Sequence, residues 1–256
     1  MGNCLFQEKR LVAWSDAPGA VRVASLNEPA RGADLNSDLA EAIPVEFSPD
    51  GRLLVIGSLK GKNLEIREVD GGRLLANLEV RGGHPLMGFA NKGRTFVAVN
   101  LVPSANEVVF LDVTQPEMKP IRFTERGALG GLTASSDGRL VAVCSQNGFV
   151  VLYDAQTMER KKVLHGHMQG VHGIRFSPDG KSLVSSSGAR EAVKIWHVET
   201  GQELLTLRGK GSLLSVVEFV ENGDAMLAGS AGQAGKWQVW RAPSWAEIDA
   251  AEKAKK

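Results

Sequence analysis

The chain has 256 residues and a formal net charge of +1, because 30 Lys and Arg are balanced by 29 Asp and Glu. This balance excludes the basic field of a typical nucleic-acid-binding protein and a polybasic membrane-surface segment. No run of 18 apolar residues exists, so no membrane span is expected. Two cysteines, Cys4 and Cys144, predict no disulfide framework and a reducing, cytoplasmic compartment.

Short runs of alternating apolar residues, separated by Gly, Pro and Asp, predict antiparallel strands from the beginning of the chain. In the first unit we expect strands over 3–6, 10–15 and 20–26. A fourth strand near 32–36 is poorly patterned. The unit is therefore a small four-stranded meander, which cannot bury both of its faces without neighbours.

The opening Met-Gly-Asn-Cys resembles an acylation signal in which Gly2 and Cys4 would carry lipids. That signal requires Ser or Thr at the sixth position, where this chain has Phe6. We therefore interpret Cys4 and Phe6 as core residues of the first strand.

The turn pattern Phe-x-x-x-Gly recurs through the chain and defines a repeat. Its first residues are separated by steps of 42, 45, 42 and 43, and the longest step is explained by a longer predicted loop over 102–107. Third-strand ends recur independently at Ala24, Arg67, Leu111, Tyr153, Trp196 and Trp240, with steps of 42 to 44. Four strands in roughly 40–45 residues is the period of a propeller blade. The turn landmarks are Phe47, Phe89, Ala134, Phe176 and Phe219.

The sequence resembles the WD40 β-propeller family over nearly its whole length. The resemblance rests on this period, on the Phe-Ser-Pro-Asp-Gly turns, and on Ile195-Trp196-His197 following Gly166-His167 at the family's spacing. It implies an all-β fold, a β-propeller of about six four-stranded antiparallel blades. We expect residues 1–243 to form the propeller, with blades at 1–36, 42–78, 85–124, 129–164, 171–207 and 213–242.

The last predicted blade is incomplete, because no fourth strand follows Trp240. Ser244 and Glu247 have the spacing of a capping box, which predicts a short C-terminal helix over 244–256. The residues around Trp245 also resemble the ending of bacterial WD40-repeat proteins that often follow a Ser/Thr kinase domain. Three explanations of ring closure stay open: the helix shields the last blade, the ring is an open crescent, or an upstream blade of a longer parent is missing.

Three histidines, His165, His167 and His172, lie within eight residues and raise the hypothesis of a metal site. No carboxylate pair accompanies them, so we predict no metal and no cofactor. The resemblance implies instead that His167 bonds a second-strand Ser among 185–187 and then Trp196. The acid that usually completes this network is absent near Arg190, so we expect the network to be incomplete.

The resemblance implies a non-enzymatic scaffold or sensor that binds a protein or peptide through its loops. Partners of the family dock on the face made by the loops that enter each innermost strand and those that join strands two and three. The corresponding set is mildly basic with apolar members, so we expect an acidic or amphipathic partner, with no nucleic acid and no membrane. The candidate residues are Lys60, Lys62, His84, Met87, Arg126, Leu129, Gln169, Arg190, Lys210 and Leu213.

Two alternatives remain at this point. A propeller enzyme would need an ionisable pair at the channel mouth, whereas the predicted innermost strands are mostly apolar or small. A truncated remnant of a larger WD40 protein would have no activity of its own and would melt in a broad, non-cooperative transition. The sequence does not define the oligomeric state.

Overall fold

The structure is a computed structural model of the whole chain, and it describes residues 3–6, 10–17, 20–58, 63–80, 86–102, 105–117, 119–188, 191–209, 214–220, 223, 225–229 and 237–241. These residues form β-strands, the turns that join them, and a turn of 3-10 helix, η1 (Asn91–Gly93). All strand pairs within the described sheets are antiparallel, and consecutive strands are neighbours. The fold is therefore all-β, as the sequence predicts.

The first three sheets each contain four strands in the order of the chain. Each sheet is a meander, so its first strand is at one edge and its fourth at the other. The strands are β1 (Asn3–Phe6), β2 (Leu11–Ala17), β3 (Ala20–Ser25) and β4 (Glu28–Asn36); β5 (Ala42–Phe47), β6 (Leu53–Ser58), β7 (Asn63–Glu68) and β8 (Leu74–Glu79); and β9 (Leu86–Ala90), β10 (Thr95–Val102), β11 (Ala105–Asp112) and β12 (Ile121–Thr124).

The fourth and fifth sheets also have four strands, and the sixth has three among the described residues. Their order is again that of the chain. The strands are β13 (Leu129–Ala134), β14 (Leu140–Ser145), β15 (Phe149–Asp154) and β16 (Arg160–His165); β17 (Gly173–Phe176), β18 (Ser182–Ser186), β19 (Glu191–His197) and β20 (Glu203–Arg208); and β21 (Val216–Val220), β22 (Ala225–Gly229) and β23 (Gln238–Arg241).

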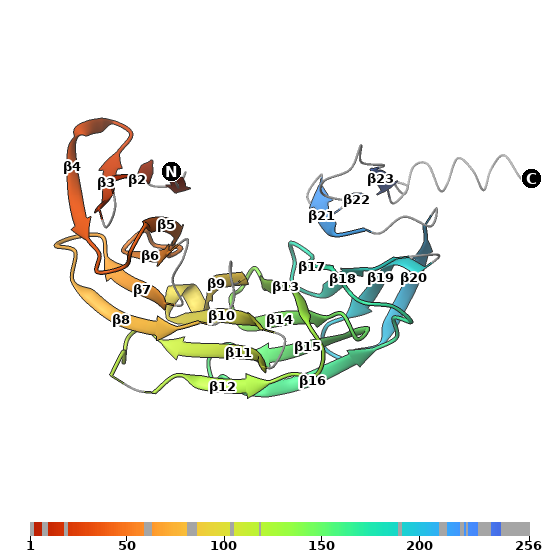
Figure 1. Ribbon diagram of the computed structural model, residues 1–256. Coiled ribbons are helices and arrows are strands. Elements are labelled where there is room, and N and C mark those ends of the chain that lie inside the picture. The colour runs from red at the N-terminus through yellow and green to blue at the C-terminus, as the bar shows by residue number, and fades with distance from the viewer. Residues whose placement is uncertain are drawn as a thin grey trace, which may run out of the picture.

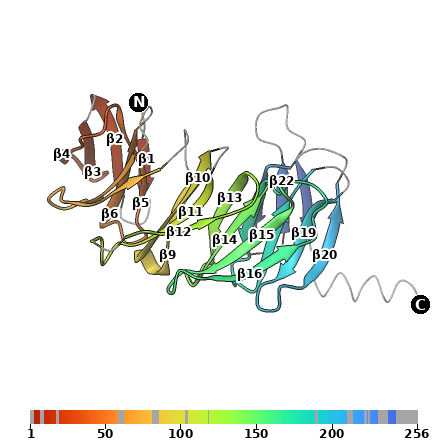
Figure 2. The ribbon, with the colours of Figure 1, turned by 60° about the horizontal axis from the view of Figure 1, so that its bottom comes forward.

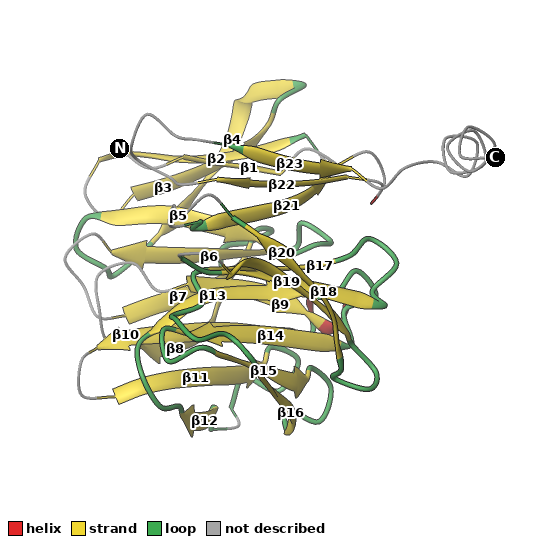
Figure 3. Ribbon diagram, turned by 90° about the vertical axis from the view of Figure 1, so that its right-hand side faces the viewer, coloured by secondary structure: helices red, strands yellow, loops and turns green. Residues whose placement is uncertain are grey.

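The sheets follow one another along an arc, with their first strands on the inside and their fourth strands on the outside (Figure 1). In the view of Figure 2, the successive sheets lie side by side along the arc. The arc is open between the first and the last sheet, at the top of Figure 1. Figure 3 views the molecule from the side of the last sheets. It shows that the strands of successive sheets run roughly perpendicular to the direction in which the sheets follow one another.

Apolar side chains hold each sheet to the next. Five buried clusters are found among the described residues, and each joins one pair of sequential sheets. For example, Val97 and Phe110 of the third sheet pack with Val141 and Tyr153 of the fourth. Burying one such side chain contributes roughly 1.5–3 kcal/mol, so the repeated junctions, not the single sheets, supply most of the stability. None of the clusters joins the first sheet to the sixth.

The repeated Phe-Ser-Pro-Asp-Gly turn forms the first hairpin of the sheets. In the fifth sheet the Ser177 hydroxyl donates to the Asp179 carboxylate at 2.6 Å, and the amide of Ser182 donates to the Ser177 Oγ at 2.9 Å. Gly180 has a φ of 69°, a left-handed conformation that favours glycine. Local hydrogen bonding therefore explains why this motif was the clearest landmark in the sequence.

Two sequence expectations differ from the structure in detail. The strand expected near 32–36 is longer in the structure, Glu28–Asn36. Its full length is not visible in the sequence, because most of its side chains are exposed at an outer edge and show no apolar alternation. The longer loop expected over 102–107 is mostly strand, since β10 and β11 remain paired as far as Val102 and Ala105. The helix expected over 244–256 lies outside the described residues.

Candidate partner-binding surface

Three connections interlock at one end of the fourth and fifth sheets. The Ser145 hydroxyl donates to the carbonyl of Arg126 at 2.9 Å, and the amide of Gln146 donates to the carbonyl of Ala128 at 2.7 Å. The amide of Val171 donates to the carbonyl of Ser145 at 3.0 Å. These bonds tie the segments 126–128, 145–148 and 166–171 to one another.

Two glycines make this close approach possible. Gly127 has a φ of 77°, and a Cβ there would lie 2.4 Å from the Asn147 amide group. Gly148 has a φ of 86°, and a Cβ there would lie 2.4 Å from the carbonyl oxygen of His167. Because a side chain at either position would collide with a neighbouring connection, the loops are held in one arrangement.

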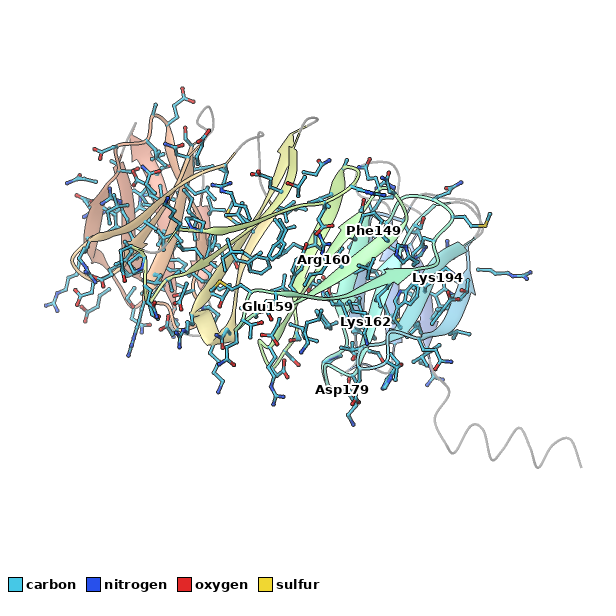
Figure 4. The ribbon with its side chains drawn as sticks, turned by 90° about the horizontal axis from the view of Figure 1, so that it is seen from below. Phe149, Glu159, Arg160, Lys162, Asp179 and Lys194 are labelled. Atoms are coloured by element: carbon cyan, nitrogen blue, oxygen red, sulfur yellow. The ribbon has the colours of Figure 1, made fainter. Side chains whose placement is uncertain are left out.

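The side chains that project from these loops are exposed, and we call them the loop surface: Arg126, Gln146, Asn147, Met168 and Gln169. Met168 is 87% exposed, more than any other large apolar side chain in the described part of the chain. Phe149, beside this surface, and Asp179, in the opposite turns, mark the two ends of the sheets in Figure 4. A rigid loop that presents a large apolar group beside a cation suits an amphipathic partner.

The structure brings two of the ten sequence-predicted residues together at this surface, Arg126 and Gln169. Met87 is half-buried at the start of β9. Leu129, at the start of β13, is 3% exposed and belongs to an apolar cluster, so its side chain lies in the interior. The other six lie outside the described residues: Lys60, Lys62, His84, Arg190, Lys210 and Leu213.

Sequence reasoning missed Met168, Gln146 and Asn147 as surface residues. A signal was available, because Met168 is a large apolar residue between the Gly166-His167 motif and Gln169, where no strand is predicted. Their grouping, in contrast, depends on contacts between connections of different repeats.

The histidine network predicted from the resemblance is present beneath the loop surface. The Trp196 Nε1–H donates to the Ser185 Oγ at 2.8 Å, and the Ser185 Oγ lies 2.6 Å from the His167 Nε2. The His167 Nδ1 is buried and has no hydrogen-bond partner in the described structure, as the missing acid predicted. Burial, with repulsion from Lys194, lowers the pKa of His167 to about 4, so the ring is neutral.

In the fourth sheet, a network around a buried carboxylate lies at a position similar to that of the histidine network. The sequence did not reveal it. Glu125, which is 8% exposed, accepts hydrogen bonds from the Tyr153 hydroxyl and from the Arg160 guanidinium. Burial, and then the Glu125 carboxylate, raise the pKa of the Tyr153 hydroxyl. The Arg160 guanidinium also lies over the Phe123 ring, 5.9 Å from its centroid.

In the fifth sheet, Lys194 is 4% exposed and is compensated by polar partners. Its Nζ donates to both Glu203 carboxylate oxygens at 3.0 and 2.9 Å and to the Thr206 Oγ1 at 2.8 Å. Figure 4 labels Lys194 and Arg160, the cations of these two networks, on adjacent sheets. The networks fix the sheets that carry the loop surface, since a buried charge must keep its partners.

The innermost strands carry ionisable residues that bear on the enzyme alternative. Arg175 of β17 and Glu218 of β21 form an ion pair. Glu46 of β5 lies over Gly88, where a Cβ would be 3.9 Å from its Oε1, and burial raises its pKa to about 7. The residue pattern of the innermost strands predicts mostly apolar or small side chains, so these charged residues differ from the expectation. Arg175 and Glu218 neutralise each other, and no described residue contacts Glu46 as an acid–base partner.

The histidines that the structure describes do not assemble with described acidic or thiol side chains into a metal-binding cluster. No group of three metal-ligating side chains occurs among the described residues. His165 is exposed beside Phe149, at 6.1 Å between ring centroids, whereas His167 is engaged by Ser185. Within the part of the chain that the structure describes, no helix is long and apolar enough to cross a membrane.

Radial four-stranded meanders with the His167–Ser185–Trp196 network define a WD40 β-propeller. The comparison with family models places the chain more closely: residues 62–249 match the family described as "Nucleolar protein 10-like, N-terminal domain", and the chain belongs to that β-propeller family.

Curated proteins similar to the chain include WD repeat-containing proteins. An uncharacterized WD repeat-containing protein of Synechocystis sp. is 29% identical over 128 residues, covering 50% of this chain and 36% of that protein. Coronin-7 of Mus musculus is 27% identical over 209 residues, covering 73% and 22%. The U3 small nucleolar RNA-associated protein 18 homolog of Mus musculus is 26% identical over 162 residues, covering 60% and 28%. The chain thus spans well under half the length of these relatives.

Proposed function

We propose that the chain is a non-enzymatic, cytoplasmic interaction module that holds a protein or peptide partner on its loop surface. WD repeat propellers are protein-interaction scaffolds in general, and a rigid frame with variable loops suits that role. In this proposal the six sheets are the blades of one domain over 1–243, and the loops present the recognition residues.

The exposure of Met168 is the observation that carries the proposal. Its large apolar side chain is 87% exposed, and its loop is fixed by hydrogen bonds and close glycine contacts, so the group is held in place for a partner. Met168 is suited to adaptable apolar contact, because its unbranched thioether fits irregular surfaces. Arg126, on the adjacent connection, adds a cation with a planar, multidentate donor group.

The expected partner is an acidic or amphipathic peptide segment. Its apolar residue would cover Met168 and its carboxylate would pair with Arg126. Other repeats carry further basic residues at the corresponding sequence positions, among them Lys60, Lys62 and Lys210. These also favour a negatively charged partner.

Site-specific photocrosslinking tests this proposal. A photoreactive phenylalanine analogue replaces Met168, and in a matched variant it replaces Lys181, which is exposed at the opposite turns. In lysate of the source organism we expect a discrete crosslinked protein from position 168 and none from position 181. Equal crosslinking from both positions, or none from 168, contradicts the proposal.

Charge reversal then tests the chemistry with the purified crosslinked partner. Arg126→Glu should weaken its binding about 10-fold or more, because the change replaces an attraction with a repulsion. Arg139→Glu is the matched control, since Arg139 is also exposed but lies beside Asp137 in the opposite turns. If the two variants bind the partner equally well, the loop surface does not contribute to binding.

Association with a ribonucleoprotein is a second candidate, favoured by the nucleolar family description and by the small nucleolar RNA-associated relative. The net charge of +1 gives it no electrostatic support. Ribonuclease treatment before crosslinking separates the two, because a direct protein partner survives it and an RNA-bridged one does not.

A further inference from the structure

A groove lies between the fourth and fifth sheets, at the end that carries their first turns and opposite the loop surface. Its volume is about 430 Å³, which is within the range of small-molecule sites. We call it the basic groove, because its lining includes Arg139, Lys161, Lys162 and Lys181. Lys162 of the fourth sheet and Asp179, in the turn that precedes Lys181, are labelled in Figure 4.

Two of these cations are neutralised within the fourth sheet. The Arg139 Nε lies 3.4 Å from an Asp137 carboxylate oxygen, and the Lys161 Nζ lies 3.3 Å from an Asp154 carboxylate oxygen. The positive charge of the basic groove therefore depends on the other two cations, Lys162 and Lys181.

Lys162 occupies a position that is apolar in the other sheets. It lies on β16 and pairs with Leu152 of β15. The residues in the same register of the second, third and fifth sheets are Ala76, Ile121 and Leu205. The Lys162 Nζ donates to the backbone carbonyl of Glu199 at 2.5 Å, and no described carboxylate lies within ion-pair distance of it. The substitution thus adds a charge that the described chain does not compensate.

The turn of the fifth sheet fixes the Lys162 side chain. Gly201 has a φ of 74°, and a Cβ there would lie 2.5 Å from the Lys162 Cδ, so the aliphatic stem packs directly on the turn. The side chain is half-buried as a result. An ammonium group has three N–H donors, and the Glu199 carbonyl accepts one of them. Two donors remain for a ligand at a defined place in the groove.

Lys181 lacks the acid that its counterparts have. The third strands of the second, third and fourth sheets end on an acid that pairs with a cation, and these acids are Glu68, Asp112 and Asp154. Strand register places His197 at this position in the fifth sheet. Its Nδ1 lies 2.9 Å from the Thr200 Oγ1, and its ring carries no negative charge.

The third sheet shows what this change removes. Arg94 precedes β10 as Lys181 precedes β18, and its guanidinium lies 3.0 Å from the Asp112 carboxylate. No carboxylate lies within ion-pair distance of Lys181 in the part of the chain that the structure describes. Asp179, in the same turn, accepts hydrogen bonds from the Ser177 hydroxyl and from the Lys181 amide. The Lys181 ammonium therefore adds to the positive charge of Lys162.

A larger groove, between the second and third sheets, has no such surplus. Its volume is about 890 Å³. Its three arginines each pair with an acid: Arg52 with Asp50 at 3.7 Å, Arg73 with Glu68 at 2.6 Å and Arg94 with Asp112 at 3.0 Å. Its lysine, Lys92, is accompanied by Asp70 and Glu117. Uncompensated charge, and not size, distinguishes the basic groove.

We propose that the basic groove binds a small phosphomonoester, whose phosphate lies between the ammonium groups of Lys162 and Lys181. A phosphomonoester carries about 1.5 to 2 negative charges at pH 7 and three acceptor oxygens, so it neutralises two ammonium groups, whereas a carboxylate neutralises one. Its organic part would lie against Leu140, which is half-buried in the same lining.

This inference goes beyond the proposed function, because the basic groove and the loop surface are at opposite ends of the sheets. Either proposal can fail without the other. The ligand is a small molecule, so position 181 remains a valid control for the crosslinking of proteins.

NMR titration of the full chain with phenyl phosphate tests the proposal. We expect the amide signals of Lys181 and Glu199 to shift and to saturate, while those of Gln146 and Asn147 on the loop surface stay unchanged. Phenyl sulfate has the same shape and a single charge, so it should bind about 10-fold more weakly. Shifts that do not saturate, or equal affinity for the two compounds, overturn the proposal.

Two variants remove the surplus charge and have precedents within the chain. Lys162→Met places an apolar group where other sheets have one, and His197→Asp restores the acid that would pair with Lys181. Each should weaken binding of phenyl phosphate about 10-fold or more, because a charge-assisted contact is lost or neutralised. Lys119→Met removes an exposed lysine outside the groove and should leave the affinity unchanged. Retained affinity in both variants overturns the proposal.

A third variant should have the opposite effect. Glu199 is exposed in the lining of the basic groove, and its carboxylate repels an anion. Glu199→Gln should therefore strengthen binding of phenyl phosphate about 2-fold or more. A gain in affinity cannot result from misfolding, and melting curves show whether the other variants are folded. If a phosphoserine peptide binds more tightly than phenyl phosphate, the groove takes a phosphoprotein and the proposal of a small ligand is wrong.

Discussion

The indole of Trp196 donates a hydrogen bond of 2.8 Å to the hydroxyl of Ser185, and the two side chains are 2% and 0% exposed. The same hydroxyl lies 2.6 Å from the His167 Nε2. One small side chain therefore links the third strand of the fifth sheet to the connection that carries Met168.

Replacing Ser185 should be costly for this reason. Ser185→Ala leaves the Trp196 Nε1 and the His167 Nε2 buried without their shared partner, and we expect the free energy of unfolding to fall by about 2–3 kcal/mol. Chemical denaturation followed by fluorescence measures the loss. Ser136→Ala, at an exposed serine in a turn, is the control and should change stability by less than about 0.5 kcal/mol. Equal effects of the two substitutions would show that the network is not stabilising.

The Tyr153–Glu125 hydrogen bond is expected to contribute separately. Tyr153→Phe keeps the ring contacts with Phe110 and Phe123, at 5.1 and 5.3 Å between centroids, and removes only the hydroxyl. Because the acceptor is a charged carboxylate, the loss should be about 1.5–3 kcal/mol, while Arg160 keeps Glu125 paired. Calorimetric melting of both proteins gives the difference. An unchanged melting temperature would mean that Arg160 alone satisfies Glu125.

Glu46 predicts a specific pH dependence of stability. Burial raises its pKa to about 7 from an ordinary value of 4.5, so the folded protein holds a proton that the unfolded chain has lost between these pH values. Stability should therefore fall as pH rises from 4.5 to 7, by up to about 3 kcal/mol, and stay lower above that range.

The variant Glu46→Gln isolates this effect. It should be more stable than the parent at pH 8 and similar to it near pH 4.5, where the parent carboxyl is largely protonated in the folded state. His167 acts in the opposite direction, because its lowered pKa of about 4 removes stability as pH falls below 6.5. It is present in both proteins, so their difference reports Glu46. A pH-independent difference would refute the assignment.

Cys144 provides a probe of cooperative unfolding. Its side chain is fully buried at the junction of the fourth and fifth sheets, its Sγ is 3.5 Å from the carbonyl oxygen of Val171, and burial raises its pKa to about 12. In a Cys4→Ser background we expect no thiol labelling under native conditions, and labelling in denaturant that follows the loss of circular dichroism. Labelling well before that transition would support the alternative of a non-cooperative remnant.

The sequence alone determined the local architecture of the repeat. The Ser-Pro-Asp-Gly turns follow from residues within five positions of each other, as the hydrogen bonds of Ser177 with Asp179 and Ser182 illustrate. The recurrence of these turns along the chain then gave the period and the strand order. The His167–Ser185–Trp196 network was also accessible, because the family resemblance supplied its spacing.

The tertiary structure alone decided which of these residues meet and which remain exposed. Glu125 contacts Tyr153 and Arg160, which lie 28 and 35 residues away, and no spacing rule predicts that contact. Val184 and Leu227 look alike in sequence, yet one is fully buried and the other faces the opening of the arc. Burial is a property of the neighbouring sheet, and its presence or absence depends on how the repeats stack, not on any residue within them.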